Sequence, residues 1–291
     1  MKKCPICQAP IVEGAHFCHM CGIPLKNAQE ELDRRMRAGE LPLYQHAFQV
    51  QGEQKLIEVW CHDLTTFPQY IDLLTISAFQ DSYNVNTKSV IGALWNSMRL
   101  DVGKLLKDPY IDLRSYVGCW LSRELPATST NGHFGRIGCI SLNGKEAEPG
   151  HIMNRLRSYF HMLDLAADAG VAMETIALPI IGTGRQKINT ETILLPLMND
   201  VVAFMKRNNS VRKVLFVEFD WNKCRTASPV LSAFIQRRRT GCQKRDGALF
   251  FPELHYSRRH PCSRTSARRT EAPRVPLLVC ARQYPHRGLC P

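Results

Sequence analysis

Short apolar runs alternate with amphipathic stretches through the middle of the chain. Residues 175–181 are an almost unbroken apolar run, which is typical of a strand buried on both faces of a sheet, and residues 54–60 and 70–79 are two further predicted strands. Residues 152–169 and 189–208 carry their apolar side chains at helical spacing, which predicts two amphipathic helices. Strands that alternate with helices favour an α/β domain, with a mixed or mainly parallel sheet and helices on both faces.

A glycine turn follows the run at 175–181. Gly182, Thr183 and Gly184 stand between this predicted strand and the next predicted helix. Open α/β sheets hold ligands at the carboxyl ends of their strands, and glycines there let backbone N–H groups approach an anion. Arg185 could add a contact to a phosphate, or could remain solvated. This stretch is a candidate phosphate-binding loop, and an ordinary strand-to-helix turn is the alternative interpretation.

Two short motifs lie within this predicted domain. Residues 62–65 read His-Asp-Leu-Thr, and residues 176–184 read Ile-Ala-Leu-Pro-Ile-Ile-Gly-Thr-Gly. Together with a buried strand that begins near Asp72, they resemble the macro domain, a three-layer α/β/α module that binds ADP-ribose and related nucleotides. The resemblance covers about residues 43–220. It implies that Asp63 accepts a hydrogen bond from the adenine amino group, while the glycine loop wraps the diphosphate.

Other residues near these motifs are weaker candidates for ligand contacts. Leu64 follows Asp63 in the first motif, and Ser77 lies close to the end of the second predicted strand. Ser77 could equally be ordinary polarity near a loop. Asp63 itself has a structural alternative, because an aspartate before Leu-Thr-Thr can be the N-cap of a short helix.

The chain departs from the macro-domain pattern where catalysis would take place. After the aspartate corresponding to Asp72, the family carries Ile-Val-Asn-Ala-Ala-Asn, whose asparagines meet the distal ribose. Residues 74–79 here read Leu-Thr-Ile-Ser-Ala-Phe, and the family's glycine triplet is replaced by Thr-Lys-Ser at 87–89. These departures favour a module that binds or senses an ADP-ribose-type nucleotide. An ADP-ribosyl or nucleotide hydrolase is the alternative, and the sequence leaves open whether the protein is an enzyme.

Two CxxC pairs stand near the amino terminus, Cys4 with Cys7 and Cys18 with Cys21. On two tight turns, such pairs can hold one Zn²⁺ in a tetrahedral site of four thiolates. No coordination position then remains for a substrate, so the zinc would be structural. Residues 1–26 resemble a short zinc ribbon, a module that contacts nucleic acid or protein. A disulfide pair and an iron site are the alternatives.

The net charge of +12 comes from the carboxyl-terminal part of the chain. Residues 1–220 hold 23 Lys and Arg against 23 Asp and Glu, whereas residues 221–291 hold 15 against 3. Residues 222–291 show no clear periodicity, which predicts a disordered tail. The tail could be an extension read past a frameshift. Alternatively it could be an arginine-rich arm that, with the ribbon, binds nucleic acid.

The remaining predictions concern the linker and the compartment. Residues 27–42 are charged and helix-prone, which predicts a linker helix before a macro-like domain at 43–221. The chain has no apolar run long enough to span a membrane, and its start lacks the apolar region of a signal peptide. We therefore expect a cytoplasmic protein with no membrane partner, in which cysteines stay reduced or bind metal.

Overall fold

The structure is a computed structural model that describes most of the first 227 residues. The described residues are 3–4, 9–20, 24–79, 82–85, 89–126, 133–142, 148–184, 186–227, 230–231 and 234. The chain divides into two compact units, Met1–Arg245 and Asp246–Pro291, and every described residue belongs to the first.

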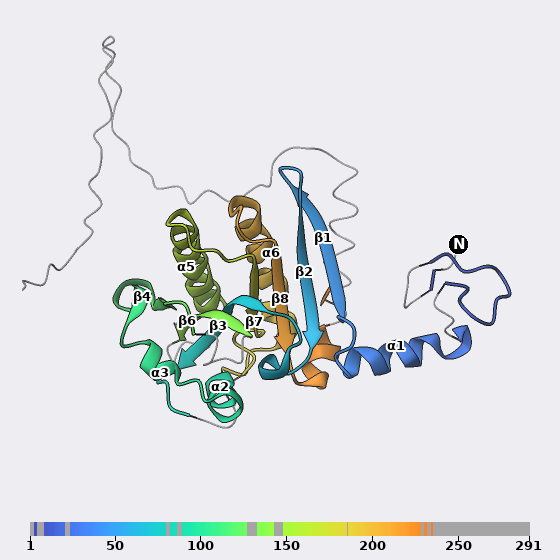
Figure 1. Ribbon diagram of the computed structural model, residues 1–291. Coiled ribbons are helices and arrows are strands. Elements are labelled where there is room, and N and C mark those ends of the chain that lie inside the picture. Colours follow the sequence, from blue (N-terminus) through green and yellow to red (C-terminus); the bar gives the residue numbers. More distant parts are fainter. Residues whose placement is uncertain are drawn as a thin grey trace, which may run out of the picture. The chain divides into compact units, whose positions relative to one another are not determined.

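One eight-stranded sheet organises the described part of the chain (Figure 1). Its strand order is β1-β2-β8-β7-β3-β6-β5-β4. The strands are β1 (Tyr44–Val50), β2 (Glu53–Cys61), β3 (Ile71–Phe79), β4 (Pro109–Asp112), β5 (Cys119–Ser122), β6 (Phe134–Leu142), β7 (Thr175–Leu178) and β8 (Lys213–Glu218). Neighbours among β2, β8, β7, β3 and β6 pair in parallel, whereas β1, β5 and β4 pair antiparallel to their neighbours. The predicted mixed sheet is confirmed.

Six helices and two short 3₁₀ turns lie among or before the strands in the described part of the chain. They are α1 (Ala28–Arg37), α2 (Val90–Met98), α3 (Val102–Leu105), α4 (Arg114–Val117), α5 (Pro149–Asp168) and α6 (Thr190–Arg207), with short 3₁₀ turns η1 (Leu25–Asn27) and η2 (Leu64–Thr66). The two long helices correspond to the predicted amphipathic stretches. No helix among the described residues combines the length and apolar character needed to cross a bilayer.

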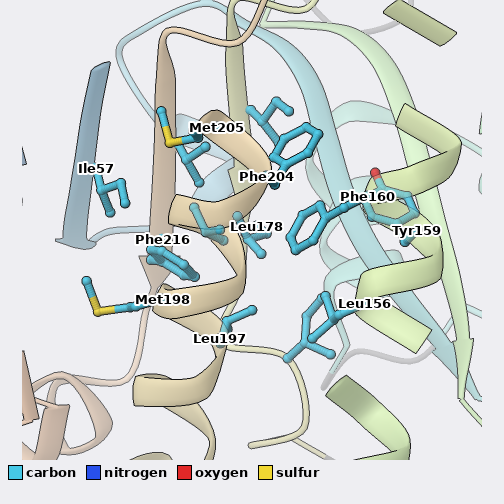
Figure 2. Packing of buried hydrophobic residues seen from close by; sticks show 14 of the residues in the cluster. Ile57, Leu156, Tyr159, Phe160, Leu178, Leu197, Met198, Phe204, Met205 and Phe216 are labelled. Carbon is cyan, nitrogen blue, oxygen red and sulfur yellow. The ribbon is translucent and has the colours of Figure 1, made fainter. Parts of the chain in front are cut away.

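Each face of the sheet has its own hydrophobic core. Along β3, Leu73 belongs to the core with α5 and α6, and its neighbour Leu74 to the core with α2 and α3. This alternation follows from the two-residue period of a strand. Between α5 and α6, the rings of Phe160 and Phe204 stack with their centroids 4.7 Å apart (Figure 2). Helices therefore cover both faces of the sheet.

Ordered structure continues beyond β8. Residues 221–227 are helical, and the side chains of Ala227, Leu231 and Phe234 are buried in the core that contains α5 and α6. The chain is thus still packed on the domain at residue 222, where the sequence predicts the tail to begin. The rest of the predicted tail, residues 235–291, lies outside the described residues.

Candidate functional site

The five parallel strands end at the same edge of the sheet. Asp63 follows the end of β2, and the 182–184 turn follows the end of β7, with β8 between these two strands. Neighbouring strands lie about 4.8 Å apart, so two such steps separate these strand ends by about 10 Å. The fold therefore brings together the two motifs that the sequence singled out.

The glycine loop after β7 is closed by short hydrogen bonds. Thr183 donates from its backbone N–H and from its hydroxyl to the Ile180 carbonyl oxygen, at 3.3 and 2.7 Å. Gly182 has a φ of +94°, and a Cβ atom there would lie 2.9 Å from Cδ1 of Ile152 in α5. Only glycine suits both the backbone angle and this close approach to a helix.

The rest of the loop faces outward. Gly184 is exposed, and a Cβ atom built on it would meet no atom within 4 Å. Arg185 lies outside the described residues. The loop is thus anchored at Gly182 and Thr183, and open at Gly184, where an anion could approach the backbone.

Asp63 is the N-cap of η2. Its Oδ1 atom accepts hydrogen bonds from the backbone N–H and the hydroxyl of Thr65, both at 2.8 Å. The capping interpretation of Asp63 is therefore confirmed. Both bonds end on Oδ1, so within the described part of the chain Oδ2 remains as an acceptor for a ligand. The side chain of Leu64 is only 7% exposed and packs in the core with α2, so a ligand could reach only its backbone.

The sequence did not single out Phe219. This residue follows β8, which ends between the strands that lead to Asp63 and to the glycine loop. Its side chain is 75% exposed, which is unusual for a phenylalanine. An exposed aromatic ring at this edge offers a flat apolar surface for a nucleotide base.

A buried carboxyl lies beneath this edge of the sheet. Glu218, the last residue of β8, is 5% exposed, and burial raises its pKa. The Lys223 ammonium, 3.7 Å away, and the Asp220 N–H, 3.2 Å from Oε1, oppose that rise. The Glu218 carbonyl oxygen also accepts a 3.1 Å hydrogen bond from the His62 N–H, which joins the ends of β8 and β2.

Ser77 and Asp72 lie at opposite ends of β3. Ser77 is half-buried near the carboxyl end, opposite Ile140 of β6, so it lies near the edge of the sheet that carries the glycine loop. Asp72 lies near the amino end, and its Oδ2 accepts a 2.7 Å hydrogen bond from the Thr175 N–H of β7. Asp72 therefore ties two strands together away from the candidate site.

Each of the two cysteine pairs is flanked by an isolated backbone bridge. An isolated antiparallel bridge joins Lys3 to Pro10 around the first pair, and another joins Phe17 to Pro24 around the second. Cys4 and Cys18 are both buried. Cys7 and Cys21 lie outside the described residues, and the described residues alone contain no cluster of three or more metal-ligating side chains.

Comparison with known proteins was made at the levels of sequence and structure. No protein-family profile matches the chain, and no curated protein matches it. Among solved structures, a mutant of the Oceanobacillus iheyensis macrodomain is 12% identical with a TM-score of 0.50, covering 66% of this chain and 94% of that one. The same macrodomain with MES bound is 14% identical with a TM-score of 0.50, covering 66% and 98%. The chain has a macrodomain-like fold. The structural similarity, and not the sequence identity, shows this fold.

Proposed function

We propose that the macrodomain-like domain binds ADP-ribose or a related nucleoside diphosphate at the carboxyl edge of its sheet, as a binding or sensing module. One observation carries this proposal: Asp63, Phe219 and the 182–184 loop follow the carboxyl ends of β2, β8 and β7, which are neighbours in the sheet. The Oceanobacillus iheyensis macrodomain has itself been solved with ADP.

Asp63, Phe219 and the 182–184 loop each suit one part of such a ligand. Oδ2 of Asp63 accepts a hydrogen bond from the amino group of the base, while Oδ1 keeps capping η2. The exposed Phe219 ring stacks on the base. The loop around Gly184 offers backbone N–H groups to the diphosphate, and Arg185 adds a positive charge. Ser77, on the adjacent strand β3, lies on the side where the distal end of the ligand would extend.

Binding is favoured over hydrolysis by the side chains that β3 carries. The Thr75 hydroxyl is fully buried and hydrogen-bonded to the Tyr159 hydroxyl at 2.9 Å, so it faces a helix and not the ligand edge. Ser77 is half-buried, and no asparagine occurs at residues 74–79. A hydrolase acting on an ADP-ribosyl or nucleotide substrate remains the alternative. Release of free ADP-ribose from an ADP-ribosylated protein by the purified chain would favour it.

Calorimetric titration of the full chain with ADP-ribose and with ADP tests the binding proposal. Asp63→Ser keeps an N-cap residue but removes the second carboxylate oxygen, so we expect affinity to fall by about 1.5–3 kcal/mol. Phe219→Ala should cost about 1–3 kcal/mol through lost stacking. Tyr70→Ala is the matched control, because Tyr70 is 54% exposed but precedes β3 at the opposite edge of the sheet. Absence of binding by the unaltered chain would contradict the proposal. Equal losses of nucleotide affinity in Phe219→Ala and Tyr70→Ala would also contradict it.

We also propose that Cys4, Cys7, Cys18 and Cys21 hold a structural Zn²⁺. The supporting observation is that both cysteine pairs are bracketed by an antiparallel bridge in the same register, from the residue before the first cysteine to the proline three residues after the second. Two equivalent turns of this kind can present four thiolates to one ion. Nucleic acid or protein as the partner of this segment, and nucleic acid as the partner of the basic tail, stay predictions from the sequence.

A further inference from the structure

The turn between α1 and β1 packs directly against the residue before Asp63. Gly39 in this turn has a φ of +71°, and a Cβ atom built on it would overlap the His62 ring and lie 3.1 Å from the Cys61 carbonyl oxygen. The imidazole of His62 therefore packs against the backbone of Gly39, at the position that a Cβ atom would occupy. No other side chain could replace Gly39 without moving His62.

His62 in turn is fixed to the loop that carries Asp63. Its Nδ1 lies 2.9 Å from the Asp63 carbonyl oxygen, within hydrogen-bond distance. Its ring meets the buried Phe67 ring edge-on, with centroids 5.4 Å apart and an interplanar angle of 86°. Gly39, Phe67 and Asp63 thus hold the imidazole from three directions. A displacement of the ring would be passed to the Asp63 backbone.

A second contact joins α1 to the segment that follows Phe219. The guanidinium of Arg37, the last residue of α1, lies 4.8 Å from the centroid of the Trp221 ring. Trp221 begins the 221–227 helix, two residues after Phe219. The end of α1 and the turn after it therefore contact the segments that follow β2 and β8, which carry Asp63 and Phe219.

We propose that His62 and Trp221 are positioning residues, through which the α1–β1 segment sets the geometry of the base subsite. This inference rests on the proposed nucleotide binding and extends it. It makes α1, which connects the cysteine-containing segment to the sheet, a determinant of nucleotide affinity and of base choice. A purely structural packing contact would affect stability but would not change the preference between bases.

Gly39→Ala and Gly170→Ala in the full chain form a matched pair. Both glycines have positive φ, +71° and +86°, so both substitutions strain the backbone to a similar extent. Only at Gly39 does the new methyl group meet His62, since nothing lies within 4 Å of a Cβ atom at Gly170. We expect Gly39→Ala to weaken ADP binding about fivefold or more, and Gly170→Ala to leave it unchanged.

Base preference is the measurement that separates positioning from stability. Inosine diphosphate lacks the amino group that Asp63 would bind, so the ratio of its affinity to that of ADP reports the Asp63 contact. We expect this discrimination to fall in Gly39→Ala and to be kept in Gly170→Ala. Adding His62→Gly to Gly39→Ala removes the overlap with the imidazole ring, and the double variant should then show the same base discrimination as His62→Gly alone.

Three results decide the inference. In the first, the unaltered chain binds ADP while the two glycine variants show equal ADP affinity and equal discrimination against inosine diphosphate. This result would overturn the role of the α1–β1 segment and leave the proposed function intact. An unaltered chain that binds no nucleotide would overturn both. If Gly39→Ala does not fold, His62→Ala removes the ring without backbone strain. Retention of discrimination by that variant would also overturn the inference.

Discussion

Glu218, the last residue of β8, has a buried carboxyl at the edge of the sheet that carries the candidate site. Burial raises its pKa above the ordinary value near 4.5, despite the nearby Lys223 ammonium. A carboxyl whose pKa is higher in the folded than in the unfolded state favours the folded state while it is protonated. That contribution is fully present below the unfolded pKa and is lost as pH rises through the folded pKa.

Glu218→Gln should therefore change how stability depends on pH. Glutamine keeps an acceptor for the Asp220 N–H but cannot ionise. We expect the variant to gain stability relative to the unaltered chain as pH rises above about 4.5, and to lose that advantage below it. Urea unfolding midpoints measured across this range would show the crossing. Glu174→Gln is the control, because Glu174 is exposed. A difference that does not vary with pH would contradict the argument.

Single residues were predictable where their type fits one backbone role. Gly182 was singled out by its motif, and its positive φ and contact with Ile152 explain why a glycine stands there. Asp63 was found with two alternative roles, and the structure confirms the cap. Phe219 was missed because it continues an apolar strand pattern, and periodicity does not reveal that the chain leaves the sheet one residue earlier, at Glu218.

Whole elements were predictable where both faces are buried. The predicted strands at 54–60, 70–79 and 175–181 correspond to β2, β3 and β7, whose residues are mostly buried, whereas β1 (Tyr44–Val50) alternates half-buried and exposed residues and carries Gln and His. Its edge position explains that weaker pattern. The packed segment after β8 has Ala227, Leu231 and Phe234 at helical spacing, but its basic composition made it resemble a tail.

Lys55 shows how an element can depend on a residue that looks exposed in sequence. Its side chain is 1% exposed, and its ammonium donates to the carbonyl oxygens of Asn208, Asn209 and Val211 at 3.3, 3.1 and 2.7 Å. These carbonyls lie just beyond the end of α6, where a helix dipole favours a cation. Lys55 thus connects β2 by hydrogen bonds to the segment between α6 and β8.

Replacing Lys55 by methionine should weaken that junction. The variant keeps the apolar stem but leaves buried carbonyl oxygens without their donor, so we expect a loss of about 2–3 kcal/mol in unfolding free energy. Urea denaturation gives the measurement. Lys104→Met is the control, because the Lys104 side chain is 73% exposed and it should cost little. Equal losses in the two variants would show that the three carbonyl contacts do not stabilise the fold.

At the scale of the molecule, the strand order and the site arise together. Crossovers place β8 between β2 and β7, and β7 beside β3, so that residues more than a hundred positions apart share one edge. The apolar pattern predicted β2, β3 and β7 but contains no information on which strands are neighbours. The macro-domain resemblance implied a three-layer α/β/α module in which Asp63 and the glycine loop contact one ligand, and the structural similarity supports the fold.

The cysteine-containing segment is expected to be energetically separate from this sheet. Neither hydrophobic core contains a residue before Leu43 among those described. If Cys4, Cys7, Cys18 and Cys21 hold zinc, its removal by a chelator should unfold the turns around them, because such turns have little apolar core. The main unfolding transition of the sheet should remain.

Metal analysis and thiol labelling test this expectation together. We expect one Zn²⁺ per purified chain, and the four amino-terminal cysteines should react with a thiol reagent only after chelation. Cys119 is a control within the same molecule, since burial raises its pKa to about 12 and should keep it unreactive until the sheet unfolds. Cys18→Ser should abolish metal binding and leave the main transition in place. A chain without zinc would contradict the proposed metal site. A sheet that unfolds on chelation would contradict the separation, because the metal would then support the whole fold.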